Sequence, residues 1–147
     1  MVEEIFTDLA PLAEKRSITL EAEGDSSLTG NDALIYHLLF NLTENAVKYN
    51  RPGGFVRVTL GGTETECVLR VEDNGIGIPE EDRPRVFDRF YRVDKMRSRA
   101  AGGTGLGLSI VADTVRRRGG SLAVSARAGG GTCFTVRLPA VRREGET

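Results

Sequence analysis

The sequence is poor in the residues that build metal centres and disulfide frameworks. Its 147 residues include no tryptophan, one histidine and two cysteines. The spacing of Cys67 and Cys133 fits neither a metal site nor a disulfide framework, so we expect both to be small, buried apolar residues. No apolar run approaches the ~18 residues that a membrane span needs, and no signal-type segment is present. These absences favour a soluble protein in a reducing compartment.

An excess of either charge is also lacking. Lysine and arginine total 20 and aspartate and glutamate total 21, so the net charge of −1 gives no reason to expect nucleic acid or a membrane surface as a partner. Basic residues do cluster between Arg83 and Arg99, where they can meet a polyanion. A composition of 39% hydrophobic and 28% charged residues predicts one globular domain over residues 1–147, with a polar tail at 140–147.

Two common phosphate-binding loops are missing as well. The chain has no Gly-x-x-x-x-Gly-Lys-Ser/Thr run, and no three glycines fall at i, i+2 and i+5. Glycine is instead concentrated at residues 73–78 (Asp-Asn-Gly-Ile-Gly-Ile) and 102–108 (Gly-Gly-Thr-Gly-Leu-Gly-Leu), and an asparagine-rich segment, residues 41–50, precedes both. If these segments bind a phosphate, their geometry differs from that of the two common phosphate-binding loops.

Apolar residues recur at helical spacing in residues 3–16, 32–48 and 106–118. The second segment has the most continuous apolar stripe. In the third segment the apolar residues, Ile110 among them, are predicted to face the core, and Gly119 with its neighbour should stop the helix. Three helices are therefore expected.

Alternating apolar and polar residues predict five strands. The connection at residues 61–63 (Gly-Gly-Thr) suits a hairpin between the second and third strands, and residues 128–131 suit one between the fourth and fifth. With the helices, these strands predict an α+β fold, a two-layer α/β sandwich with helices on one face of a mostly antiparallel sheet. The predicted strands are residues 17–22, 55–60, 67–72, 122–126 and 133–138.

One face of the second helix carries an unusual mixture of polar groups. Asn41, Glu44, Asn45 and Lys48 lie at i, i+3, i+4 and i+7. A magnesium-bound triphosphate needs such a mixture, because oxygen atoms suit the hard cation and an ammonium suits the phosphate. A solvated helix face explains the same pattern, so the pattern alone leaves both interpretations open.

Asp73 stands where the third predicted strand ends, and Gly75 and Gly77 allow the backbone to approach a flat ligand. A carboxylate there can accept a hydrogen bond from an exocyclic amine. It would select adenine over guanine, because a polar group left unpaired in the wrong complex costs ~1–3 kcal/mol. An ordinary Asp-Asn-Gly turn is the alternative interpretation.

The second glycine segment, residues 103–107, leads directly into a helix, so its backbone N–H groups can meet phosphate oxygens. A flexible hinge before the helix is the alternative. The hydroxyl groups of Thr104 and Ser109 can either contact a ligand or cap the helix. Before this segment, residues 82–89 suggest a turn or two of helix, and Phe87 and Phe90 are expected to anchor a loop to the core.

Together these segments resemble the catalytic, ATP-binding domain of sensor histidine kinases, within the wider group that includes DNA gyrase, the Hsp90 chaperones and the MutL ATPases. Each segment alone is a weak signal, but five of them in the family's order are specific. The matching boxes are residues 41–49 (N box), 73–77 (first glycine box), 87–90 (F box), 103–107 (second glycine box) and 129–134 (last glycine box).

The resemblance implies a Bergerat-type fold, with about five strands, three helices and a mobile ATP lid at residues 89–103. It also implies ATP and Mg²⁺ as cofactors. By position, Asn45 should bind the metal, Asn41 should lie beside the phosphates, Lys48 should contact a phosphate oxygen and Tyr49 should lie near the nucleoside.

The resemblance assigns the adenine amine to Asp73 and suggests Arg92 of the lid as a contact of the γ-phosphate. Asn41, Asn45, Lys48 and Arg92 form the implied catalytic set. The other residues implied to bind the nucleotide are Gly75, Gly77, Ile78, Thr104, Gly105, Leu106, Gly107, Leu108 and Thr132.

Asn41 separates two branches of the wider group. The ATPases carry a glutamate that activates water at this position, and an amide cannot act as a general base at neutral pH. Phosphoryl transfer to a protein side chain is therefore favoured over hydrolysis. A regulatory module or serine kinase, like the anti-sigma-factor kinases, is the alternative function.

The phosphoacceptor histidine of such kinases lies on a dimerisation helix pair that this sequence does not contain. Residues 3–16 resemble the segment that joins this pair to the catalytic domain. The expected partners are therefore the helix pair of a parent kinase and, indirectly, a response regulator. A cytoplasmic location is expected, whether or not the parent is anchored in a membrane.

Overall fold

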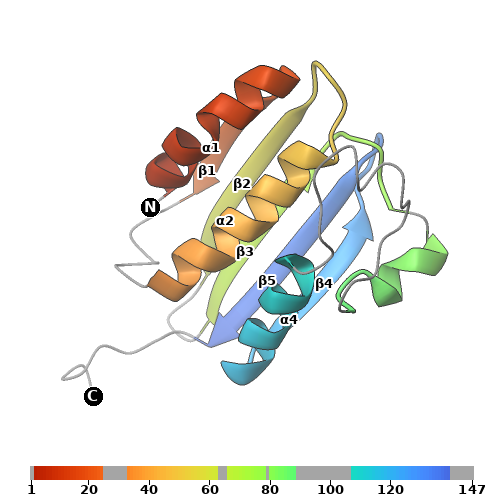
Figure 1. Ribbon diagram of the computed structural model, residues 1–147. Coiled ribbons are helices and arrows are strands. Elements are labelled where there is room, and N and C mark those ends of the chain that lie inside the picture. The colour runs from red at the N-terminus through yellow and green to blue at the C-terminus, as the bar shows by residue number, and fades with distance from the viewer. Residues whose placement is uncertain (1, 25–32, 63–65, 79, 89–106, 140–147) are drawn as a thin grey trace.

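The computed structural model describes residues 2–24, 33–62, 66–78, 80–88 and 107–139 (Figure 1). No helix in this described part is long and apolar enough to cross a membrane. The elements are α1 (Val2–Arg16), β1 (Thr19–Gly24), α2 (Ala33–Lys48), β2 (Phe55–Gly62), β3 (Glu66–Asp73), the 3-10 helix η2 (Glu80–Arg85), α4 (Gly107–Arg117), β4 (Ser121–Ala126) and β5 (Thr132–Pro139).

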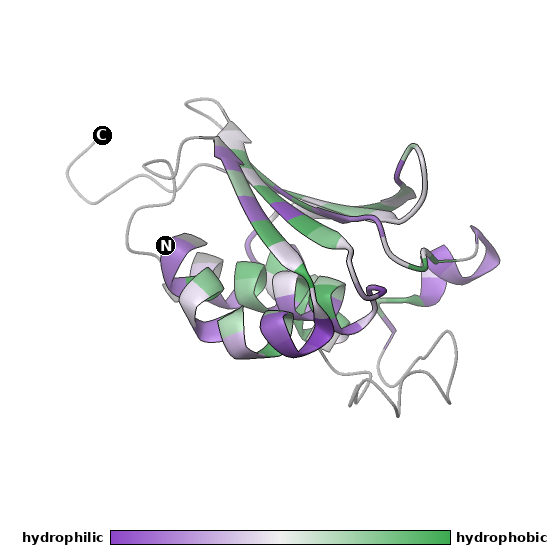
Figure 2. Ribbon diagram, turned by 90° about the horizontal axis from the view of Figure 1, so that it is seen from above, coloured by the Kyte–Doolittle hydropathy of each residue, from purple (hydrophilic) through white to green (hydrophobic). Residues whose placement is uncertain are grey.

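The five strands form one sheet in the order β1-β2-β3-β5-β4. β1 runs parallel to β2, and the other neighbouring pairs are antiparallel. Helices α1, α2 and α4 cover one face of this sheet and leave the other face open (Figures 1 and 2). The predicted α+β two-layer sandwich, with a mixed and mostly antiparallel sheet, is confirmed.

The core lies between the helices and the sheet, and hydrophobic and hydrophilic residues alternate along the strands in Figure 2. Leu9 of α1 and Leu39 of α2 are buried against Val58, Val71 and other strand residues. Because alternate strand residues point to opposite faces, Val71 faces the helices while Glu72 faces the open side. The same alternation sends the next residue, Asp73, toward the helices.

The hairpin between β2 and β3 is confirmed, but its predicted glycine connection is wrong. Gly61 and Gly62 lie inside β2, paired with Val68 and Cys67. Glycine weakens a strand, yet its backbone still makes the ladder hydrogen bonds, and pairing with β3 outweighs local preference. Residues 63–65, between the strands, lie outside the described part.

Other local predictions also need correction. Ile110 is 53% exposed rather than buried. Val111 and Val115 face the core, and a helix turns about 100° per residue, so Ile110 is rotated toward solvent. Cys67 is half-buried, whereas Cys133 is buried as expected. The predicted helical turn is a 3-10 helix, Glu80–Arg85.

The F-box segment does rest on the core. The ring of Phe87 lies edge-on to that of Phe134 in β5, with 6.0 Å between the ring centroids. The anchoring role predicted for Phe87 is therefore supported, whereas Phe90 lies outside the described residues. This contact holds the segment after η2 against the same strand that borders Asp73.

Candidate functional site

Asp73 is the last residue of β3, and only 5% of its surface is exposed. Its Oδ1 accepts a hydrogen bond of 2.8 Å from the backbone N–H of Gly75. Burial raises the pKa of Asp73 to about 6, and the negative charge of Glu72 acts in the same direction. Backbone hydrogen bonds from Gly75 and Thr132, and the positive charge of Arg127, act against this rise.

The sheet brings the last glycine box to the same carboxylate. Thr132, the first residue of β5, is the register partner of Asp73 and is also buried. Gly131 lies even closer, since a Cβ built on it would be 1.9 Å from the carbonyl oxygen of Asp73. Two boxes that are far apart in sequence therefore meet at Asp73.

Gly75 is required by a contact within the protein. A Cβ on Gly75 would lie 2.9 Å from Cα of Asn50 and 3.0 Å from Oδ1 of Asp73. The sequence predicts that this glycine allows the close approach of a ligand, and packing against the segment after α2 is by itself a sufficient reason for it. Gly77 has a φ of 75°, which itself favours glycine.

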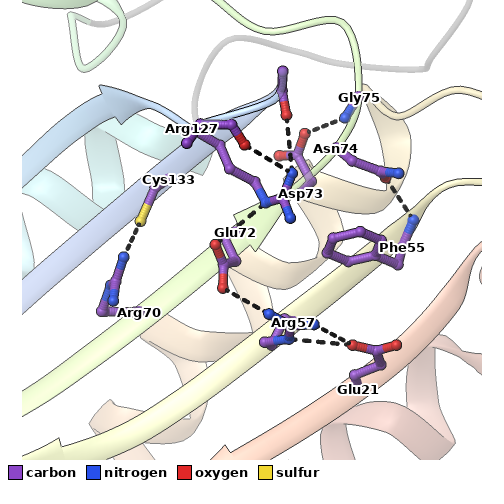
Figure 3. Close-up of polar contacts among 12 residues, drawn as sticks. Glu21, Phe55, Arg57, Arg70, Glu72, Asp73, Asn74, Gly75, Arg127 and Cys133 are labelled. Carbon is purple, nitrogen blue, oxygen red and sulfur yellow. Dashed lines mark hydrogen bonds and ion pairs between the residues drawn. The ribbon is translucent and has the colours of Figure 1, made fainter.

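A polar strap that the sequence did not reveal joins the end of α2 to the starts of β2 and the first glycine box. Oδ1 of Asn50 accepts the N–H of Arg51 at 2.8 Å, and its Nδ2 donates to the carbonyl of Phe55 at 2.9 Å. The N–H of Phe55 donates to Oδ1 of Asn74 at 2.7 Å (Figure 3). The side chain of Arg51 donates two hydrogen bonds to the carbonyl of Asn74, at 3.0 and 2.9 Å.

This strap positions the polar face of α2 relative to Asp73. Because Asn50 lies two residues beyond the end of α2 and leaves no room for a Cβ on Gly75, the end of the helix is fixed beside the carboxylate predicted above to select adenine. The only sequence signal for the strap was that Asn50 and Asn74 flank element ends. Asparagine is so common at such ends that this signal had no specificity.

The predicted phosphate and metal residues lie on α2, where Asn41, Asn45 and Lys48 are all half-buried. Nζ of Lys48 is 3.6 Å from Oε1 of Glu44, so the ammonium is paired within the helix. Among the described residues there is no group of three or more His, Cys, Asp or Glu that could hold a metal ion. Tyr49 is half-buried just beyond the helix.

The second glycine box is described only from Gly107, where α4 begins. Leu108 packs against the core, Ser109 is buried, and Ile78 of the first glycine segment also packs against the core. Four predicted site residues lie outside the described part of the chain, as does the predicted lid at residues 89–103. They are Arg92, Thr104, Gly105 and Leu106.

Residues 30–142 match the family described as histidine kinase-, DNA gyrase B-, and HSP90-like ATPase. The sensor histidine kinase RppB of Synechocystis sp. is 38% identical over 142 residues, which are 95% of this chain and 31% of that protein. The chain spans less than a third of the length of this relative.

Solved structures agree in fold. The catalytic domain of histidine kinase ThkA has a TM-score of 0.79 and 25% identity, covering 95% of this chain and 90% of that one. Full-length ShkA in complex with AMPPNP has a TM-score of 0.78 and 26% identity, covering 95% of this chain and 29% of that one. The chain belongs to the histidine kinase-, DNA gyrase B- and HSP90-like ATPase family, as a catalytic ATP-binding domain of the sensor histidine kinase type.

Proposed function

We propose that this chain binds magnesium-ATP and presents the γ-phosphate for transfer to a histidine on a separate dimerisation and phosphoacceptor helix pair. The observation that carries this proposal is the buried carboxylate of Asp73, held by the backbone N–H of Gly75 at the end of β3. The backbone of Gly75 and Thr132 already donates hydrogen bonds to this carboxylate, and its remaining lone pairs can accept a nucleobase amine.

Asp73 gives the site a preference for adenine. With a pKa of about 6, Asp73 is mostly ionised at pH 7.5, so its oxygen atoms only accept hydrogen bonds. The exocyclic amine of adenine donates one. Guanine presents a carbonyl oxygen at the corresponding position, which would face the carboxylate with like partial charge and leave both groups unpaired.

The polar face of α2 fits the triphosphate and its metal. Amide oxygens of Asn45 and Asn41 are hard donors, and such donors suit Mg²⁺. The described residues hold no acidic cluster that could bind the ion unaided, so the metal would bind together with the phosphates. When bound, Mg²⁺ supplies charge neutralisation at the phosphate oxygens.

Lys48 would leave Glu44 to contact a phosphate oxygen. Their 3.6 Å pair is partly exposed to solvent, with the two side chains 25% and 33% exposed. Pairs of this kind contribute less than about 1 kcal/mol, so a phosphate can replace Glu44 at small cost. We propose Arg92 and the lid at residues 89–103 as further contacts of the γ-phosphate.

Asn41 supports transfer over hydrolysis. It occupies a half-buried position on α2, one turn before Asn45, where an amide cannot take a proton from water. Positioning and charge neutralisation are then the main contributions of this chain, and the acceptor comes from the helix pair. AMPPNP is an analogue of ATP, so its presence in the ShkA complex supports the nucleotide assignment.

The transfer is tested by mixing the 147-residue chain with the phosphoacceptor helix pair of a related kinase and γ-labelled ATP. We expect label on the helix pair that is stable in alkali and lost in acid, as phosphohistidine is. A helix pair with its acceptor histidine replaced by glutamine is the control. Acid-stable label on serine would favour the anti-sigma-factor type of kinase, and phosphate release without labelling would identify an ATPase.

A further inference from the structure

A row of alternating charges crosses the open face of the sheet and ends beside the candidate site. Arg57 of β2 lies 3.1 Å from Oε2 of Glu21 and 3.5 Å from Oε1 of Glu72. Nε of Arg127 lies 3.4 Å from Oε2 of Glu72, so Glu72 stands between two guanidinium groups. Both guanidinium groups lie over the ring of Phe55, at 5.3 and 4.8 Å from its centroid. Figure 3 shows this row running toward Asp73.

Arg127 also holds the turn between β4 and β5. Its Nη1 donates to the carbonyl oxygens of Ala128 and Gly130 at 3.3 and 3.4 Å. Its backbone N–H donates to the carbonyl of Gly131 at 3.1 Å, and its carbonyl accepts the N–H of Gly130 at 3.0 Å. Gly129, Gly130 and Gly131 all have positive φ, at 87°, 111° and 108°. Three successive glycines restrain a turn little, so the side chain of Arg127 supplies much of its order.

The turn that Arg127 holds packs directly against Asp73. Gly131 leaves no room for a Cβ against the carbonyl of Asp73, and Thr132 donates a backbone hydrogen bond to the carboxylate. Movement of residues 128–131 would therefore displace a donor that orients the carboxylate. The positive charge of Arg127 acts on Asp73 in addition, against the negative charge of Glu72.

We propose that Arg127 is a positioning residue for nucleotide recognition: pairing with Glu72 and clamping the glycine turn, it holds Asp73 in the geometry that accepts the adenine amine. This inference rests on the proposed role of Asp73. The side chains of Arg127 and Glu72 are only 24% and 17% exposed, so their pair is screened less than a surface pair.

The chain offers a matched control on the same face of the sheet. Arg137 of β5 pairs with Glu66 at 2.8 Å, with side chains 53% and 41% exposed. Register places this pair at the end of β3 opposite to Asp73. Removal of the Arg137 charge therefore tests the general effect of breaking an Arg–Glu pair on the sheet.

The experiment measures ATP affinity by calorimetry between pH 5.5 and 8 for wild type, Arg127→Met, Arg127→Lys and Arg137→Met. Methionine keeps an unbranched apolar side chain but has neither charge nor donors, so the contact of the guanidinium with the ring of Phe55 is lost as well. We expect Arg127→Met to weaken ATP binding about two- to fivefold at pH 7.5. Because ionised Asp73 binds the amine, affinity falls as pH drops through its pKa, and removal of a positive charge should move this fall to higher pH.

Arg127→Lys keeps the positive charge but loses the planar guanidinium and its several donors. The pH profile should therefore return toward that of wild type, while the affinity for ATP stays reduced. Arg137→Met should leave both unchanged. Wild-type affinity and pH profile in Arg127→Met, or equal effects in Arg137→Met, would overturn the inference. If Arg127→Met does not fold, Glu72→Gln breaks the same pair and should weaken binding at pH 7.5, while the loss of its negative charge should move the fall in affinity to lower pH.

A fifth variant separates this inference from the proposed function. Asp73→Asn should bind ATP weakly and keep only the pH dependence that the phosphates of ATP themselves contribute. If it does so while Arg127→Met behaves as wild type, only the role of Arg127 fails. If Asp73→Asn binds as tightly as wild type, the proposed site itself is wrong.

Discussion

Asp73 is subject to two opposing requirements. Burial favours its neutral form, whereas the proposed recognition of the adenine amine requires the charged form. The pKa of Asp73 is about 6, because the N–H of Gly75 and the charge of Arg127 favour ionisation and so oppose the effect of burial. At pH 7.5 the ligand-free protein therefore carries a buried charge that lowers its stability, as functional residues often do.

This conflict predicts a pH dependence of stability. Because the pKa of Asp73 rises from 3.8 in the unfolded chain to about 6 on folding, its neutral form stabilises the fold below pH 3.8, and that contribution is lost as pH rises through 6. Urea unfolding should show wild type gaining about 2–3 kcal/mol relative to Asp73→Asn between pH 7.5 and pH 4. A difference between the two proteins that does not vary with pH would contradict the raised pKa.

Thr43 is a second residue whose polarity conflicts with its surroundings. Its Oγ1 is buried in α2 with no hydrogen-bond partner in the described part of the chain. Thr43→Val keeps the shape and removes the unpaired hydroxyl, so it should raise the free energy of unfolding by about 1 kcal/mol. The control is Thr114→Val, which removes a half-buried hydroxyl bonded to the carbonyl of Ile110 at 2.8 Å and should not stabilise. A loss of stability in Thr43→Val would contradict this account.

The sequence identified residues with local signatures and missed those defined by contacts between strands. Asp73 was predictable because it ends a strand and precedes two glycines. Asn50 and Arg127 were not, because their roles depend on which segments the sheet brings together. Arg127 becomes visible only once Glu72 and the glycine turn are seen to adjoin it.

At the scale of elements, the candidate site lies where one helix and one strand end and another strand begins. α2 ends at Lys48, β3 ends at Asp73, and β5 begins at Thr132, all at one end of the sheet. The first and last glycine boxes lie where these ends pack closely, so Gly75 and Gly131 serve packing within the protein, and ligand access remains a prediction. A Cβ built on Gly75 would lie 2.9 Å from Cα of Asn50, and one built on Gly131 would lie 1.9 Å from the carbonyl oxygen of Asp73.

A pair of glycine substitutions tests the close packing. Gly75→Ala would place a Cβ 2.9 Å from the backbone of Asn50, and such overpacking should destabilise the protein by about 1–3 kcal/mol. Gly61→Ala meets nothing within 4 Å in β2 and should be neutral or slightly stabilising. Thermal unfolding of both variants measures the contrast. Equal stability of the two would show that the strand end can move away from Asn50.

Element types were largely predictable and their limits less so. Helical periodicity located α1, α2 and α4, because each buries one continuous apolar stripe. Local preference predicts a turn at the glycines of β2, and the structure differs because pairing with β3 keeps both residues in the strand. Ile110 is apolar and is therefore predicted to face the core, but apolar character alone does not determine which residues of a helix face the sheet.

At the scale of the whole molecule, the boxes acquire meaning from their order. Each box has an ordinary loop or helix explanation, yet the fold brings the first and last glycine boxes together at Asp73 and sets the end of α2 beside them. The resemblance to sensor histidine kinases correctly anticipated the sheet, the three covering helices and the family. The roles of Asn41, Asn45, Lys48 and Arg92 remain predictions.

The central claim is that this end of the sheet binds magnesium-ATP through Asp73 and Asn45. Calorimetric titration of wild type, Asp73→Asn and Asn45→Ala with ATP, with and without Mg²⁺, tests it most directly. Asp73→Asn should lose about tenfold or more in affinity with or without the metal, because a buried hydrogen bond to a charged acceptor is lost. Asn45→Ala should bind ATP without Mg²⁺ about as well as wild type does, but its affinity should increase less when Mg²⁺ is added. Equal affinity for magnesium-ATP in all three proteins would contradict the account.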